Sequence, residues 1–107
     1  MTQAKYSGGY LGRLLRVNLS DKSVKTEAID PRRFELLLGG RGVAAKYYFD
    51  EIPASTEALG PANKLFFFTG PLTGLPLPST TKFQLATRSP ETRRYLCSNC
   101  GGDFGRA

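Results

Sequence analysis

Residues 11–28 read LGRLLRVNLSDKSVKTEA, two short alternating stretches separated by a polar loop. In the first stretch Leu15, Val17 and Leu19 alternate with polar residues, which is typical of a half-buried strand. Residues 24–28 alternate in the same way. We therefore predict an antiparallel hairpin, with Leu15, Val17 and Leu19 on its buried face.

A helix is predicted directly after this hairpin. Asp30 is a good N-cap, and Pro31 suits the first helical position. The Gly39-Gly40 pair predicts the end of this helix. A second helix is predicted from about Gly42 to Glu51, because a proline follows two residues later.

Three further segments are predicted to be strands. Residues 64–69 (KLFFFT) form a continuous apolar run, which indicates a buried strand. Residues 82–87 (KFQLAT) alternate, and residues 95–97 form a last short strand. Because strands and helices do not alternate along the chain, we predict an α+β fold with two short helices and a mostly antiparallel sheet.

The size and composition of the chain indicate one folded domain. Hydrophobic residues make up 40% of its 107 residues, which argues against disorder. Residues 1–8 are expected to be flexible. No apolar run approaches the ~20 residues that span a bilayer, and no apolar signal region is present at the start, so a soluble cytoplasmic protein is expected.

The net charge of +6 favours an anionic partner, such as nucleic acid or a phosphorylated ligand. One functional hypothesis is therefore a basic module that binds nucleic acid or another polyanion, with Tyr and Phe available for stacking. Against it, the aromatic residues lie in apolar runs, and no nucleic-acid-binding motif is present. Nucleic acid is thus the less favoured partner.

The sequence contains no His and two cysteines, Cys97 and Cys100, in a C-x₂-C arrangement. Such a pair is half of a zinc site or a redox pair. Structural zinc needs four ligands, and the chain has no second pair. Two ordinary cysteines near a turn are an equally good interpretation.

Two further motifs suit an anionic ligand. Gly39-Gly40-Arg41-Gly42 opens the second helix, where backbone amides attract anions and Arg41 adds a forked contact. The alternative for this run is a helix–helix corner with glycine caps. Lys82 follows a loop of small polar residues and is placed to reach a phosphate. The alternative interpretation is that Lys82 is a solvated lysine at the start of a strand.

The order and spacing of several motifs resemble the N-terminal domain of the aldehyde ferredoxin oxidoreductase family. The resemblance runs from about Gly8 to the last residue. It rests on the following motifs: Gly12-Arg13 before Leu15-Arg16-Val17-Asn18-Leu19, then Gly39-Gly40-Arg41-Gly42, Asn63-Lys64-Leu65, Gly70-Pro71-Leu72-Thr73-Gly74, Ser89-Pro90, and Asn99-Cys100-Gly101-Gly102 with Phe104-Gly105.

This resemblance implies that residues 1–107 form part of an α+β platform built from two similar intertwined halves. On that platform sits tungsten, or molybdenum, held by the dithiolenes of two pterins and not by side chains of this region. Enzymes of the family oxidise aldehydes to carboxylic acids and pass electrons through a [4Fe–4S] cluster to ferredoxin. The cluster ligands and the acid–base residues lie in later domains, so we expect this chain to need those domains, or a partner subunit, for activity.

The resemblance also carries over candidate pterin-binding residues. Lys82 matches a basic position of the family, Asn99 matches the Asn of its Asn-x-Gly-Gly turn, and Gly101 is the first glycine of that turn. Cys100 stands where Ser is common, and Arg41 completes the candidate set. Thr80-Thr81 replaces two small glycines of many members, which crowds the cofactor. No catalytic residue and no metal ligand are expected here.

The size of the chain suggests one more alternative, that it does not fold stably by itself. The second half of the platform is absent, so the strands of the first half would lack partners, and bare strand edges invite aggregation. Half a domain buries little apolar surface. On this alternative interpretation, the chain is a remnant that folds poorly.

Overall fold

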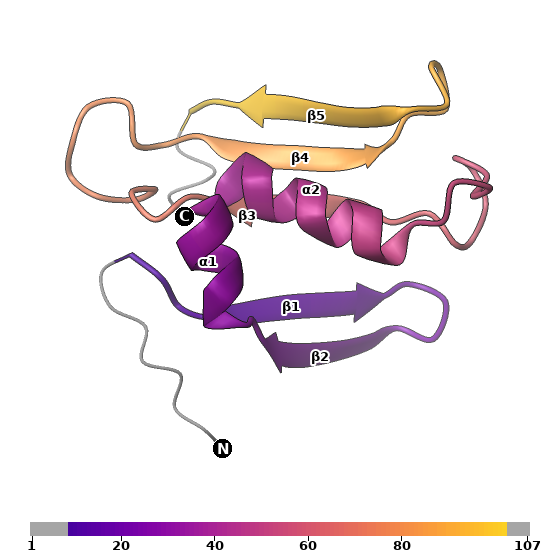
Figure 1. Ribbon diagram of the computed structural model, residues 1–107, viewed down its shortest axis with the longest axis horizontal. Helices are drawn as coiled ribbons and strands as arrows, with labels where there is room; N and C mark the ends of the chain where they lie inside the picture. The colour runs from indigo at the N-terminus through magenta and orange to yellow at the C-terminus, as the bar shows by residue number, and fades with distance from the viewer. Residues whose placement is uncertain (1–8, 103–107) are drawn as a thin grey trace.

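The computed structural model describes residues 9–102, and the expectations for residues 1–8 and for Phe104-Gly105 lie outside this part of the chain. Figure 1 shows the arrangement of its helices and strands. Within the described residues, no helix has the length and apolar character needed to cross a membrane. The elements follow in the order β1 (Arg13–Asn18), β2 (Ser23–Ala28), α1 (Pro31–Leu37), α2 (Gly40–Glu51), β3 (Phe66–Thr69), β4 (Phe83–Arg88) and β5 (Tyr95–Cys100).

The predicted hairpin is present. β1 and β2 pair antiparallel, with Arg13 opposite Ala28 and Asn18 opposite Ser23. Side-chain oxygens shape the turn, because Asn18 Oδ1 accepts from the Ser20 amide and Asp21 Oδ1 accepts from the Ser23 amide. The hairpin forms a two-stranded sheet of its own.

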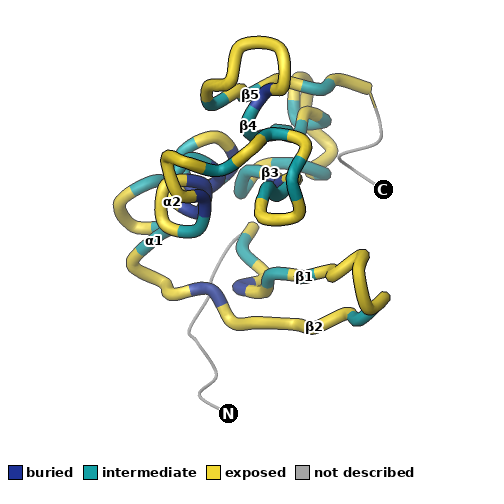
Figure 2. The backbone as a smooth tube through the Cα atoms, turned by 90° about the vertical axis from the view of Figure 1, so that its right-hand side faces the viewer, coloured by how far each residue is buried: buried dark blue, intermediate teal, exposed yellow. Residues whose placement is uncertain are grey.

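The face of the hairpin that we expected to be buried is instead open to solvent. Leu15 is 63% exposed, and Val17 and Leu19 are exposed as well. Leu14, on the opposite face, packs against the core. Figure 2 shows that most residues of both strands are exposed. Alternation therefore predicted the strand correctly, but the hairpin packs by its less apolar face, which also carries Arg16.

The first helix begins as predicted, since the Asp30 carboxylate accepts a hydrogen bond from the Arg32 amide at 3.0 Å. It ends one residue earlier than expected. Leu38 adopts a positive φ of 65°, and its N–H donates to the carbonyl of Phe34. The double glycine therefore opens α2, with Gly39 as N-cap and Gly40 as first residue, and does not close α1.

Strands β3, β4 and β5 form a second sheet in that order, and all their pairings are antiparallel. Helix α2 crosses one face of this sheet (Figure 1). The core lies between α2 and the sheet. Its buried residues are Ile29, Val43, Ala44, Tyr47, Tyr48, Ile52, Phe66, Phe68 and Ala86.

The apolar run before Thr69 is only half buried. Phe66 and Phe68 face α2, whereas Phe67 is 54% exposed on the opposite face. We expected both faces of this strand to be covered, but α2 covers one face only. Among the described residues, fifteen large hydrophobic side chains are exposed, more than the nine hydrophobic residues of the core. The predicted α+β class with a mostly antiparallel sheet is confirmed.

Candidate cofactor-binding site

Strand pairing brings the candidate residues Lys82 and Asn99–Gly101 to the same end of the sheet. Phe83 lies opposite Cys100, and Gln84 lies opposite Asn99. Lys82 directly precedes β4, and Gly101 directly follows β5, so both flank the same end of this antiparallel pair. The structure thus groups residues that are 17 or more positions apart in the sequence.

The backbone before β4 is held in place by threonine hydroxyls. The Thr73 hydroxyl donates to the Lys82 carbonyl at 3.1 Å and accepts from the Gly70 amide at 3.2 Å. The Thr80 hydroxyl lies 2.8 Å from the carbonyl oxygens of both Leu75 and Leu77. These contacts fix the backbone from which the exposed Lys82 side chain projects.

The N-terminus of α2 packs on the same end of the sheet. Gly40 is buried, and a Cβ atom there would lie 3.6 Å from Gln84 Cγ and 3.8 Å from the Gly70 amide nitrogen. At Gly42, a Cβ atom would approach the Leu37 carbonyl oxygen to 2.6 Å. Gly42 therefore serves close packing at the corner between α1 and α2, Gly40 adopts a positive φ of 48°, and Arg41 between them is exposed.

The turn after β5 is open. Asn99 is exposed, and a Cβ atom on Gly101 would meet no other heavy atom within 4 Å. Gly102 has a φ of 80°, a conformation that favours glycine. A planar ligand can therefore approach this backbone closely.

Both cysteines lie within β5, and Cys100 is its last residue, directly before the turn at Gly101. Residues three apart on a strand point to opposite faces, so their sulfur atoms cannot bind one metal ion together in this strand. The Cys97 thiol donates to Gln84 Oε1 at 3.4 Å, on the face covered by α2. Among residues 9–102 no group of three His, Cys, Asp or Glu side chains is placed to hold a metal.

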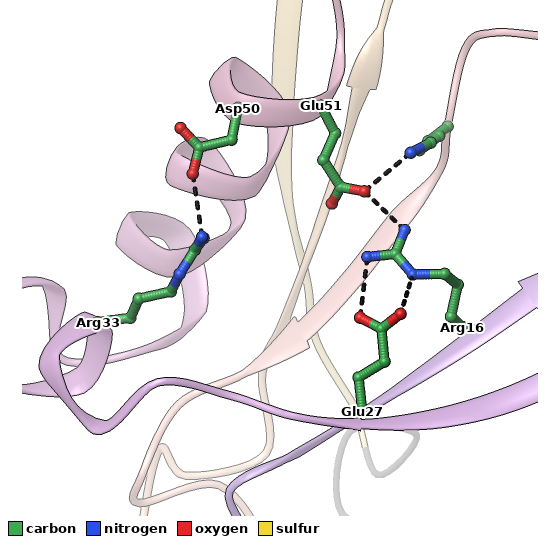
Figure 3. A network of polar contacts seen from close by, with 6 residues as sticks. Arg16, Glu27, Arg33, Asp50 and Glu51 are labelled. Atoms are coloured by element: carbon green, nitrogen blue, oxygen red, sulfur yellow. Dashed lines mark hydrogen bonds and ion pairs between the residues drawn. The ribbon is translucent and has the colours of Figure 1, made fainter.

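Charge is unevenly distributed along α2. Arg41 lies at its start, and neither Arg41 nor Lys82 forms an ion pair with an acidic residue within the described range. The acidic residues Asp50 and Glu51 lie at the other end of the helix, in the ion pairs of Figure 3. The helix N-terminus and these cations give this end of the sheet a positive potential.

The aromatic ring of Tyr95 lies between α2 and β5, 4.7 Å from the ring of Tyr48. Burial is the largest of the effects that raise the pKa of Tyr95 to about 12, and the charge of Arg41 acts in the opposite direction. Tyr95 therefore stays neutral at physiological pH. Arg41 lies within electrostatic reach of this ring.

These residues fit an anionic, hydrogen-bonding heterocycle. Lys82 supplies a cation, Asn99 an amide, and the turn at Gly101 a backbone without side-chain cover. The fit also includes a residue that sequence reasoning missed. Gln84 accepts a hydrogen bond from the Cys97 thiol, lies opposite Asn99 and is near Gly40, and only the strand register could have singled it out.

The chain is similar to a known protein family over most of its length. Residues 14–107 match the family model described as the N-terminal domain of aldehyde ferredoxin oxidoreductase. The tungsten-containing aldehyde ferredoxin oxidoreductase of Pyrococcus horikoshii is 39% identical to this chain, and that of Thermococcus kodakarensis is 40% identical, each over 97 residues. These matches cover 91% of this chain and 16% of each relative, so the chain spans about a sixth of their length.

More distant relatives carry other names. An aliphatic sulfonate oxidoreductase, WOR-like subunit, of Pyrococcus furiosus is 31% identical over 99 residues, which is 90% of this chain and 16% of that protein. A solved structure, the active site complex BamBC of benzoyl coenzyme A reductase with 1,5-dienoyl-CoA, superposes with a TM-score of 0.87 at 35% identity. That superposition covers 92% of this chain and 15% of the solved chain.

Proposed function

Because the chain belongs to the aldehyde ferredoxin oxidoreductase family, over the N-terminal domain of that family, we propose that it forms part of the platform that holds a tungsten–pterin cofactor. The observation that carries this proposal is the sheet end where Lys82, Asn99 and Gly101 meet. The names of the relatives support tungsten, and the pterin is the proposed carrier of the metal.

Each residue has a distinct role in this proposal. Lys82 would pair its ammonium group with a phosphate of the pterin, and Asn99 would hydrogen-bond the edge of its ring system. Gly101 would let the ring approach the backbone. Arg41 would add positive charge from the start of α2. Cys100 points to the opposite face from Asn99, which makes it the weakest member of the set.

The activity of a complete enzyme is a further part of the proposal. When bound, the tungsten–pterin group would supply the redox chemistry that oxidises an aldehyde to a carboxylic acid, with ferredoxin as electron acceptor. Ligands for a [4Fe–4S] cluster would come from outside this chain. Because the chain spans about a sixth of its relatives, we expect the isolated chain to show no aldehyde-dependent reduction of a viologen dye.

Cofactor retention tests the proposal most simply. A longer polypeptide that carries this segment would be produced with tungstate, and its tungsten and pterin contents would be measured per polypeptide. We expect Lys82→Met and Asn99→Ala each to lower both contents severalfold. The control is Lys25→Met, which removes an exposed lysine from the hairpin. Equal cofactor content in all four proteins would contradict the proposal.

A further inference from the structure

The β1–β2 hairpin is attached to the body of the molecule at its base. β1 begins and β2 ends at this base, where the Ile29 amide donates to the Gly12 carbonyl at 2.9 Å. Gly12 and Ile29 are both buried, and Gly12 has a φ of 67°. Away from this base the hairpin is poorly anchored, since none of the twelve residues of β1 and β2 is buried.

An ion pair links the middle of the hairpin to α2. Arg16 Nη1 donates to Glu51 Oε1 at 2.6 Å, from the middle of β1 to the last residue of the helix (Figure 3). A two-stranded hairpin without buried side chains is marginally stable by itself. The ion pair therefore acts together with the packing of Leu14 to hold the hairpin against the body.

Each charge in this link has a second partner on its own side. Arg16 also donates through Nε and Nη2 to the two carboxylate oxygens of Glu27, at 3.0 and 3.2 Å, within the hairpin. Glu51 Oε1 also accepts from Lys64 Nζ at 2.8 Å, within the body. If the Arg16–Glu51 contact breaks, neither the guanidinium nor the carboxylate loses its last ionic partner. The usual penalty for separating a partly buried ion pair is therefore reduced.

From this geometry we propose that the hairpin is a hinged flap, which turns about the Gly12–Ile29 base and is latched to α2 by the ion pair between Arg16 and Glu51. Opening the flap breaks one ion pair and uncovers Leu14, the hairpin side chain that packs against the core. The inference does not depend on the cofactor proposal. It predicts that the hairpin opens more readily than the β3–β4–β5 sheet.

Amide hydrogen exchange of the whole chain tests the latch. In Glu51→Gln we expect exchange of residues 14–18 and 23–27 to rise about fivefold, the effect of losing a partly exposed ion pair, while exchange of β4 stays unchanged. Arg16→Gln removes the same latch together with the Arg16–Glu27 pair inside the hairpin, so it should raise hairpin exchange at least as much as Glu51→Gln, and it guards against a Glu51 variant that folds poorly.

The matched control is Asp50→Asn. Asp50 pairs with Arg33 of α1 and Lys46 of α2 and does not touch the hairpin, so its loss should leave hairpin exchange unchanged. The proposal is overturned if neither latch variant changes hairpin exchange, or if exchange in β4 rises as much as in the hairpin. A rise in hairpin exchange in Asp50→Asn equal to that in Glu51→Gln would also overturn it.

Discussion

The Arg16 guanidinium and the Glu51 carboxylate meet at 2.6 Å and join the hairpin to the end of α2. Burial of the Glu51 carboxyl group opposes its ionisation, but hydrogen bonds from Arg16 and Lys64 outweigh burial, and the pKa of Glu51 lies below its usual value. A lowered pKa in the folded state stabilises the fold above the unfolded pKa of about 4.3, and this contribution is lost as the pH falls through the folded-state pKa.

Glu51→Gln should therefore be less stable than the parent chain at pH 7, by about 1 kcal/mol after allowance for solvent screening. As the pH falls below the unfolded pKa of about 4.3, the two proteins should differ progressively less, because the ionic contribution of the parent carboxyl group is lost on protonation. Urea denaturation at pH 7 and at pH 3 measures both differences. The same difference at both pH values would contradict the assignment of this ion pair.

Val43 and Val17 offer a matched pair for locating the core. Val43 is fully buried between α2 and the sheet, whereas Val17 is 52% exposed on the hairpin. Val43→Ala should lower the free energy of unfolding by about 2 kcal/mol, and Val17→Ala by less than about 0.5 kcal/mol. Thermal denaturation followed by circular dichroism measures both values. Equal effects, or a parent chain without a cooperative transition, would contradict the described core.

Gly42 tests the corner between the two helices. Alanine in a helix is usually more stabilising than glycine by about 1 kcal/mol. At Gly42, however, the new Cβ atom would lie 2.6 Å from the Leu37 carbonyl oxygen, which is backbone and cannot rotate away. Gly42→Ala should therefore destabilise the chain by about 1–3 kcal/mol.

Gly101→Ala is the control for that substitution. A Cβ atom at Gly101 meets no heavy atom within 4 Å, so the melting temperature should stay within a degree or two of the parent. A stabilised Gly42→Ala variant, measured by the same thermal melts, would show that the two helices do not meet as closely as described.

The alternative function, binding of nucleic acid through the net charge of +6, predicts a salt-dependent affinity. We expect no sequence-independent affinity beyond a Kd of about 10⁻⁴ M for single-stranded DNA or RNA at 50 mM salt, measured by fluorescence anisotropy. Four of the ten described aromatic rings support this expectation, because Tyr47, Tyr48, Phe66 and Phe68 are buried and cannot stack on bases. Micromolar binding that weakens with added salt would favour the basic module instead.

Local sequence signals predicted the elements well. The Asp30-Pro31 cap, the alternation of residues 13–28 and the glycine-rich corner each act over a few residues, and the structure confirms the elements that they predict. The buried faces could not be predicted in the same way. Leu15 and Phe67 are apolar, but whether they are covered depends on which face α2 and the rest of the chain occupy.

The candidate site shows the same limit. The residues themselves showed a cation and two glycine turns, but they did not show that Lys82 and Gly101 flank the same end of a sheet. That relationship depends on strand register, which is set by packing over the whole sheet. The roles of Lys82, Asn99 and Gly101 toward a pterin rest on family resemblance and stay predictions.

An experimental structure of a tungsten-loaded polypeptide that carries this segment tests the proposed cofactor site most directly. We expect pterin phosphate or ring atoms within hydrogen-bond distance of Lys82 Nζ and the Asn99 side chain, with the ring system against the backbone of Gly101. A metallopterin bound elsewhere, with all three residues directed away from it, would contradict the proposed site.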